Sequence, residues 1–265
     1  MASHPIYQFY AELDDCKPKI WRRFQVTDDI TVARLGYILQ VLFEMKASHL
    51  MELEVPVGDN HKAFTKKKHP EMFETLFAEY FDDIIYHYEI IYDDLEPYNL
   101  EPYVLEPYAD TPANMLTYDA TKVKIDSAVS EPGDKINFHY DFGDDWRVTL
   151  TLEKAFTDKV LHGSELPRVL DGAGFGIVGD VGGVGGLADL AKAFKKKKGP
   201  DYREFSKWLG VKDLDLSAFD LEDMNFRLKK IPRIYKQCYE DRITPTQYSI
   251  NLIERKYLKK RHDVT

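Results

Sequence analysis

One stretch in the middle of the chain alternates apolar and polar residues on both sides of a short turn. The apolar positions are Ile136, Phe138, Tyr140, Phe142, Trp146, Val148, Leu150 and Leu152. Because side chains alternate between the two faces of a β-strand, this pattern predicts a β-hairpin with an aromatic buried face. Pairing Phe142 with Trp146 keeps all eight apolar side chains on that face. The same register sets Asp141 opposite Arg147 on the other face, where their charges attract.

Similar patterns predict the remaining elements. The predicted strands are 6–13, 20–26, 48–55 and 121–126, beside the hairpin. The predicted helices are 31–46, capped by Thr31, and shorter ones near 72–77, 187–198, 201–209, 216–228 and 249–260. The chain should therefore open β-β-α-β. We expect an α+β fold with a mostly antiparallel sheet, a central hairpin and several short helices.

Two parts of the chain differ from this body in composition. Residues 82–110 carry nine acidic residues, six tyrosines and no Lys or Arg, and three Leu-Glu-Pro-Tyr repeats fall at 95–108. Since a proline at every fifth position prevents a regular helix or inner strand, we expect a surface insertion over about 82–116, either a variable loop or a partner-binding loop. The last residues are basic. We therefore predict a main domain over 1–230 and a basic C-terminal extension over 231–265.

Charge and hydropathy narrow the class of protein. From Lys229 onward the net charge is +6, which leaves −15 on the rest of a chain whose total is −9. An acidic body disfavours general nucleic-acid binding because it repels phosphates. Apolar runs are far shorter than the roughly 20 residues of a membrane helix, so we expect no membrane association. Two cysteines without a CxxC pair fit the cytoplasm.

Six short motifs occur in the order found in a known family. They are IWRR (20–23), SHL (48–50), YDFGDDW (140–146), PR (167–168), GDVGG (179–183) and MNFRL (224–228). With this series the chain resembles the plasmid pRiA4b ORF-3-like family over about 6–228. The resemblance implies an α+β protein carried on plasmids and mobile elements. The biochemical role of the family is not established.

The chain departs from the family pattern where members carry cysteine or histidine. Residues 175–180 replace a Cys-Pro-Pro-Glu-Asp-type run and keep only Asp180. Val169 stands in place of a cysteine, and Val148 in place of the histidine after the tryptophan motif. Residues 36–37 lack the histidine of the first helix. If the family has a Cys/His metal site, the resemblance implies that this member has lost it.

Charged residues of these motifs form a candidate functional cluster. Its members are Arg22, Arg23, His49, Asp141, Asp144, Asp145, Arg168 and Asp180. Carboxylates that converge with His49 or His139 would be ligands for Mg²⁺ or Mn²⁺, and the three arginines would clamp an anion. The alternatives are structural: turn residues at 144–145, an Asp141–Arg147 pair, and a strand histidine at position 49. Arg22 lies on an apolar strand face, so we expect Asp141 or Asp180 to pair with it.

The glycine-rich segment contains the string GxGxxG at 174–179. A dinucleotide site requires a helix that opens within the motif, whereas here the helix is expected only near Leu187. A structural glycine loop is therefore favoured, and the sequence leaves any cofactor unknown.

Three hypotheses of function follow. The first is a non-catalytic binding or accessory protein of a plasmid or mobile element with an unidentified protein partner, because GxSxG, HExxH and similar catalytic signatures are missing from the sequence. The second is a metal-dependent enzyme that acts on a phosphate-containing substrate through the candidate functional cluster. The third is DNA binding through the basic extension, where five cations gather at 255–261.

Overall fold

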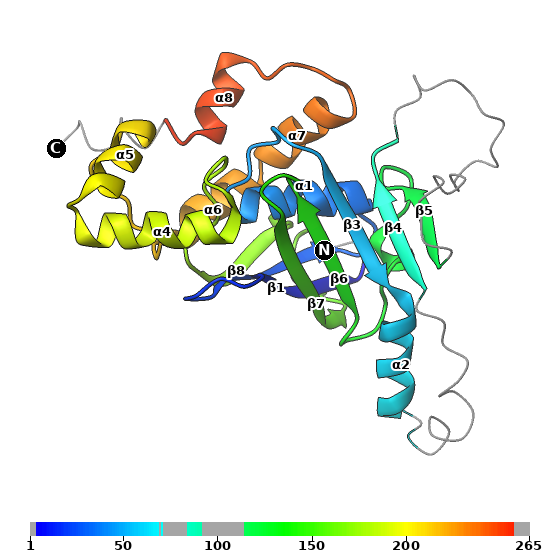
Figure 1. Ribbon diagram of the computed structural model, residues 1–265. Coiled ribbons are helices and arrows are strands. Elements are labelled where there is room, and N and C mark those ends of the chain that lie inside the picture. Colours follow the sequence, from blue (N-terminus) through cyan, green and yellow to red (C-terminus); the bar gives the residue numbers. More distant parts are fainter. Residues whose placement is uncertain (1–3, 69, 71–83, 92–113, 257–265) are drawn as a thin grey trace.

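A computed structural model describes residues 4–68, 70, 84–91 and 114–256 of the chain (Figure 1). The strands are β1 (Ile6–Leu13), β2 (Ile20–Thr27), β3 (Met51–Pro56), β4 (Ile85–Glu89), β5 (Met115–Asp119), β6 (Lys135–Tyr140), β7 (Trp146–Phe156) and β8 (Arg168–Ala173). They form one eight-stranded sheet in the order β5-β4-β3-β6-β7-β1-β2-β8. Every neighbouring pair is antiparallel except β4 and β5, which are parallel. The predicted α+β class with a mostly antiparallel sheet is confirmed.

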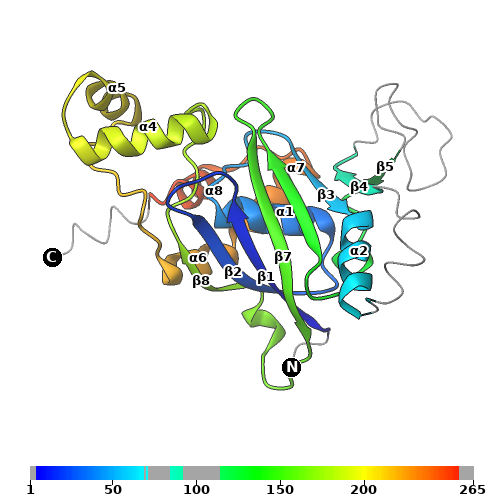
Figure 2. The same cartoon turned by 60° about the horizontal axis from the view of Figure 1, so that its bottom comes forward.

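The helices of the described residues gather mainly on one face of this sheet. They are α1 (Val32–Leu42), α2 (Val57–Lys68), α4 (Gly183–Lys196), α5 (Pro200–Leu209), α6 (Leu221–Leu228), α7 (Ile231–Tyr239) and α8 (Gln247–Ile253), with the 3-10 helices η2 (Ile125–Ser127) and η3 (Gly163–Glu165). Figures 1 and 2 show α1, α6 and α7 behind the sheet, whereas α4 and α5 lie together at one end. Within the described ranges, no helix has the length and hydropathy needed to cross a membrane.

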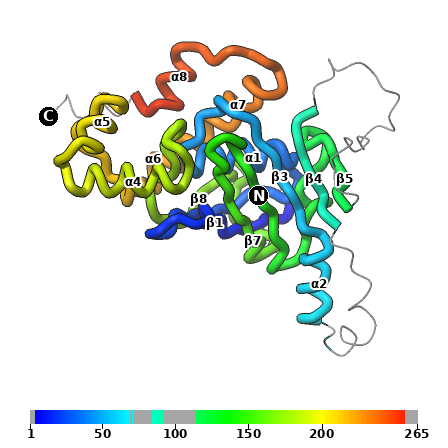
Figure 3. Tube along the Cα trace, in the orientation of Figure 1, coloured from blue at the N-terminus to red at the C-terminus, as the bar shows by residue number. Residues whose placement is uncertain are grey.

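Helix α1 lies at the centre of the core. It begins after Thr31, whose Oγ1 accepts a hydrogen bond from the Arg34 amide (3.1 Å), as the predicted N-cap requires. Ten of its eleven residues are buried, because the sheet covers one side and α6 and α7 pack on the other. Each fully buried leucine or isoleucine of the helix contributes about 1.5–3 kcal/mol to folding. The tube trace in Figure 3 shows α1 running behind the strands at the middle of the molecule.

The central hairpin forms, but with a register two residues away from the predicted one. Tyr140 rather than Phe142 pairs with Trp146, and His139 rather than Asp141 faces Arg147. A shift of two residues keeps every strand side chain on its face, so the predicted apolar positions within β6 and β7 remain buried. Phe142 instead belongs to the turn 141–145 and is 49% exposed.

Other local predictions are corrected. Residues 121–126 form no strand; one bridge joins Lys124 to Thr31, and η2 follows. Helix α1 ends at Leu42 rather than near residue 46, and β3 begins at Met51, so His49 precedes the strand. Helix α2 has no counterpart among the predicted helices.

The predicted surface insertion and the predicted C-terminal extension both contain strands or helices of the fold. Strand β4 lies within the predicted insertion over 82–116, β5 begins at the end of that insertion, and both extend the sheet. Helix α7 lies within the predicted C-terminal extension and packs on α1, with Ile231 and Tyr235 fully buried. The Leu-Glu-Pro-Tyr repeats and the helix predicted near 72–77 lie outside the described residues.

Candidate functional site

Three motif segments converge where the hairpin turn meets the residues before β3 and the glycine-rich loop before α4. His49 Nε2 lies 3.4 Å from Asp141 Oδ2 and 3.8 Å from Asp180 Oδ1. One potential ligand atom from each of the three residues lies within 4.8 Å of the other two. We call His49, Asp141 and Asp180 the His49 centre. It unites three residues of the predicted cluster that are far apart in the sequence.

Backbone hydrogen bonds hold Asp141 in place. The residue follows β6 in the left-handed region (φ 59°), which aspartate tolerates better than most residues. Its amide donates to the Leu50 carbonyl oxygen (3.1 Å), which ties the turn to the segment of His49. Its Oδ1 accepts from the amides of Gly143 (3.2 Å) and Asp144 (3.4 Å). These bonds leave Oδ2 directed at His49 in a side chain that is only 10% exposed.

His49 is fixed through its backbone and its ring. The Tyr239 hydroxyl donates to the His49 carbonyl oxygen. The imidazole lies edge-on to the ring of Tyr140, with centroids 5.7 Å apart at 88°. The Ser48 amide donates to the same tyrosine's hydroxyl (3.3 Å). The side chain remains 32% exposed, so solvent reaches the His49 centre from one side.

The glycine-rich loop brings Asp180 to the hairpin turn. The Gly182 amide donates to Asp144 Oδ2 (3.3 Å). Gly183 has φ +65°, and a Cβ at this position would collide with the Asp144 carbonyl oxygen. Only glycine therefore allows the loop to rest on the turn. Asp180 itself also has a positive φ (59°), and its side chain is 79% exposed.

The GxGxxG string has a packing role in this loop. At Gly176 (φ +132°), a Cβ would lie 2.6 Å from the Phe43 carbonyl oxygen. The Ile177 amide donates to the same oxygen (2.9 Å). Helix α4 begins at Gly183, four residues before the predicted Leu187 and still after the string ends at Gly179. The close contact with Phe43 accounts for a glycine here without a nucleotide.

Arg22 does not join the His49 centre, and its predicted pairing with Asp141 or Asp180 is wrong. The side chain is fully buried and directs all five guanidinium N–H groups at backbone carbonyl oxygens. The acceptors are Leu42, Trp21, Ala173, Gly174 and Phe175, at 2.8–2.9 Å. Burial lowers the pKa of Arg22 to about 10. Arg22 therefore fastens the glycine-rich loop to β2 and to the end of α1, and so positions Asp180 indirectly.

The other two arginines of the predicted cluster lie on the opposite face of the sheet. Arg23 makes a bidentate pair with Glu153, at 2.7 and 2.8 Å. Arg168 Nε donates to Gln25 Oε1 (2.9 Å). Because neighbouring residues of β2 point to opposite faces, Arg22 and Arg23 cannot bind one anion together. The three arginines do not assemble the expected anion clamp.

The last two aspartates of the cluster have separate partners. Asp145 Oδ1 lies 2.9 Å from Arg147 Nε and 2.7 Å from His139 Nε2. Asp145, rather than the predicted Asp141, therefore forms the ion pair with Arg147. Asp144 anchors the glycine-rich loop, as described above. Both also line an open pocket of about 440 Å³ beside the His49 centre. The lining residues are Asp14, Asp15, Asp144, Asp145, Arg147, Gly182, Gly183 and Val184.

Sequence reasoning missed a buried ion cluster near the end of α1. Glu44 accepts from Arg227 (2.7 Å) and Arg255 (2.8 Å), and Arg255 also binds Asp223 (2.6 Å). Arg255 was expected among the cations of a nucleic-acid-binding tail, but it is used in this cluster. Neither periodicity nor spacing signals the cluster, because its members lie far apart in the sequence; an arginine among the apolar residues 224–228 is the one hint.

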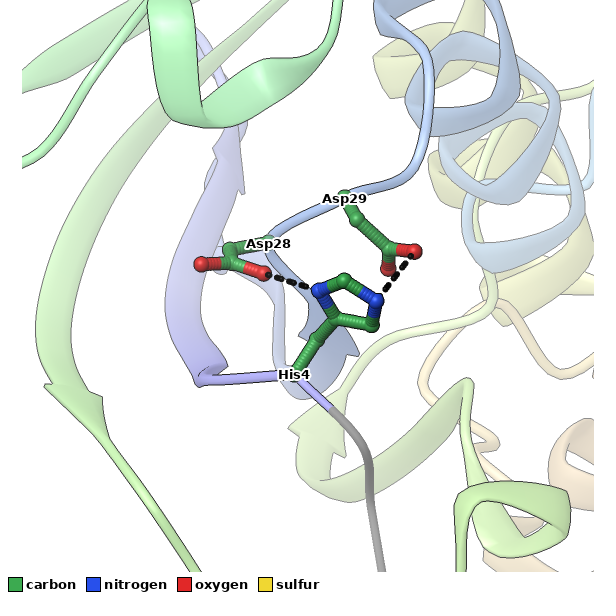
Figure 4. A group of neighbouring side chains, drawn as sticks. All are labelled: His4, Asp28 and Asp29. Atoms are coloured by element: carbon green, nitrogen blue, oxygen red, sulfur yellow. Dashed lines mark ion pairs between the residues drawn. The ribbon is translucent and has the colours of Figure 1, made fainter.

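A second group with metal-ligand residue types lies where β1 begins and β2 ends (Figure 4). His4 Nδ1 is 3.8 Å from Asp28 Oδ1, and His4 Nε2 is 3.4 Å from Asp29 Oδ2. The ring thus offers a different nitrogen to each carboxylate. In the His49 centre the shortest contacts of both carboxylates are to one nitrogen. In either group, one ligand atom from each residue lies within 4.8 Å of the other two.

Comparison with known proteins places these features in a family. Residues 5–226 match the family model described as plasmid pRiA4b ORF-3-like protein. Among solved structures, the fold is similar to the crystal structure of MM3350, a protein of unknown function from Methanosarcina mazei Go1, with a TM-score of 0.59, 21% identity, and coverage of 83% of this chain and 97% of that chain. No curated protein matches the sequence. Since the family model spans most of its length, the chain belongs to the plasmid pRiA4b ORF-3-like family.

Proposed function

We propose that this protein binds a divalent transition-metal ion at the His49 centre and serves a plasmid or mobile element as a binding or accessory protein. The observation that supports this proposal is the convergence of two carboxylates on one imidazole nitrogen, His49 Nε2. Each of the three residues belongs to a different family motif. A shared ligand explains why these separate motifs meet at one point.

The spacing of the three side chains fits a shared ion better than direct pairing. Two ligand atoms that each lie about 2.1 Å from a tetrahedral ion are about 3.4 Å apart. The separations from His49 Nε2, 3.4 and 3.8 Å, are close to this value. Both exceed the roughly 2.7–3.2 Å expected of an N–H···O hydrogen bond. Small rotations of the exposed Asp180 would complete the geometry.

The donor set favours Zn²⁺ or Mn²⁺. An imidazole nitrogen suits Zn²⁺ and other first-row transition metals, whereas two carboxylates also suit Mn²⁺. Three protein ligands leave at least one position for an oxygen ligand from solvent or from a partner molecule.

The free cysteines Cys16 and Cys238 support a reducing, cytoplasmic setting.

The contacts of the three arginines favour a binding or accessory role over catalysis on a phosphate-containing substrate. A phosphoryl-transfer site needs cations that stabilise the developing charge on the phosphate. Arg22 is saturated by carbonyl oxygens, Arg23 by Glu153, and Arg168 bonds to Gln25. None of the three is directed at the His49 centre. The enzyme hypothesis would need a substrate bound without them.

Isothermal titration calorimetry with MnCl₂ and ZnCl₂ tests the proposal. Wild-type protein should bind one equivalent of at least one ion, and Asp141→Asn or His49→Gln should weaken binding by about 100-fold or more, because each removes a direct ligand. Asp171→Asn is the control, since this exposed aspartate on β8 is distant from the centre in the sheet order. Binding that is absent in the wild type, or unchanged in both ligand variants, would reject the proposal.

A further inference from the structure

Helices α4 and α5, with their connection and the residues that follow, form a basic unit at one end of the molecule (Figures 1 and 2). We call residues 183–213 the basic hairpin. It carries eight Lys or Arg and four acidic residues, a net charge of +4. The other residues of the chain sum to −13. This separation of charge concentrates the attraction for an anionic partner on the basic hairpin.

Most cations of the basic hairpin lack a carboxylate partner among the residues that the structure describes. All eight are exposed. Only Lys192 and Lys197 make ion pairs within the described parts of the chain, with Asp189 and Asp213. The six others are Lys195, Lys196, Lys198, Arg203, Lys207 and Lys212. Four of the eight cations are consecutive lysines, which repel one another, and the carboxyl end of α4 offsets that repulsion only in part. Such a group of cations is suited to binding several consecutive phosphates.

Helix α5 adds an exposed aromatic side chain to these charges. None of its residues is fully buried. Trp208 is 48% exposed and follows Lys207 directly, while its ring meets that of Phe205 at a centroid distance of 6.3 Å. Val211 is also exposed, one residue before Lys212. An indole beside unpaired lysines resembles the stacking surfaces on which single-stranded bases rest.

We propose that the basic hairpin binds single-stranded nucleic acid. The six cations without an ion pair among the described residues, from Lys195 to Lys212, contact phosphates, and the indole of Trp208 stacks on an unpaired base. A duplex would offer phosphates to the cations but no free base to the indole, because its bases are stacked on one another. The acidic remainder of the chain repels the strand and so confines it to this end of the molecule. The proposal does not depend on metal at the His49 centre.

Fluorescence anisotropy with a labelled 20-nucleotide single strand of mixed sequence tests this inference on the full chain. With six phosphate contacts on a single strand, the affinity should fall about 340-fold between 50 and 200 mM salt. The triple variant Lys195→Glu, Lys196→Glu, Lys198→Glu should bind at least tenfold more weakly and show a slope of log affinity against log salt reduced by about 2. Trp208→Ala should weaken binding by about tenfold.

A matched triple variant controls for the change of net charge. Lys122→Glu, Lys124→Glu and Lys159→Glu alter exposed lysines that have no ion pair among the described residues, and this variant should retain at least a third of the wild-type affinity. Equal loss in both triple variants would show attraction by net charge alone and overturn the inference. Duplex of the same sequence bound as tightly as the single strand, or no binding to either at 50 mM salt, would also overturn it. The second result would direct the search to an acidic protein partner.

Discussion

His87 on β4 should make the stability of the protein depend on pH. Its side chain faces three carboxylates: Glu54, opposite it on β3, and Glu52, both at 3.8 Å, and Glu89 at 4.0 Å. Burial alone would lower the pKa of His87. The carboxylates of Glu54 and Glu89, with the charge of Glu52, outweigh burial and raise the pKa from 6.5 to about 9.

The sign of the effect follows from the raised pKa of His87. The native state binds the proton more tightly than the unfolded chain, so protonation stabilises the fold. The contribution is complete below pH 6.5 and disappears as the pH rises through 9. A difference between 6.5 and about 9 corresponds to about 3 kcal/mol. Because solvent screens ion pairs near the sheet surface, we expect about 2 kcal/mol.

Urea denaturation of wild type and His87→Gln at pH 6 and pH 10 measures this contribution. The wild-type free energy of unfolding should fall between these two pH values by about 2 kcal/mol more than that of the variant. With a urea slope of about 3 kcal/mol per molar, the difference in midpoint shift is about 0.7 M. His162→Gln, which alters an exposed histidine in a loop, is the control. Parallel pH dependences for wild type and His87→Gln would refute the reasoning.

Two further predictions concern the loop and the buried charges. Gly183→Ala should lower the free energy of unfolding by about 1–3 kcal/mol and weaken metal binding, because its Cβ collides with the Asp144 carbonyl oxygen. Gly185→Ala places its Cβ in open space and should leave the stability unchanged or raise it. Chemical denaturation and calorimetry of both variants check this. Arg227→Met should lower the melting temperature by about 10 °C, because it leaves the buried Glu44 short of one partner; a decrease below about 2 °C in differential scanning calorimetry would contradict it.

The fold could be predicted from the sequence where apolar and polar side chains alternate. It could be predicted less well where a turn determines which residues of two strands pair. Alternation in residues 136–152 specifies which side chains share a face, but shifts of the register by two residues preserve that face. The five-residue turn selects the Tyr140–Trp146 pairing, with Asp141 and Asp145 in the left-handed region. Strand β4 was missed because IYHYE mixes charge with aromatics, and those polar side chains pair with their neighbours on β3.

The candidate site was predicted in part for similar reasons. Motif order brought His49, Asp141 and Asp180 into one group, and the structure places them together. The role of Arg22 was not visible in the sequence, because its partners are backbone carbonyl oxygens, which every residue carries. A buried arginine could be predicted from its strand face; the identity of its acceptors required the fold.

A crystal structure of the protein with Mn²⁺, with data collected at a wavelength that gives a manganese anomalous signal, tests the His49 centre most directly. We expect one strong anomalous peak about 2.1 Å from His49 Nε2 and from a carboxylate oxygen of each of Asp141 and Asp180. An ion found elsewhere, or no peak beside His49 while Asp141 keeps its present hydrogen bonds, would contradict it.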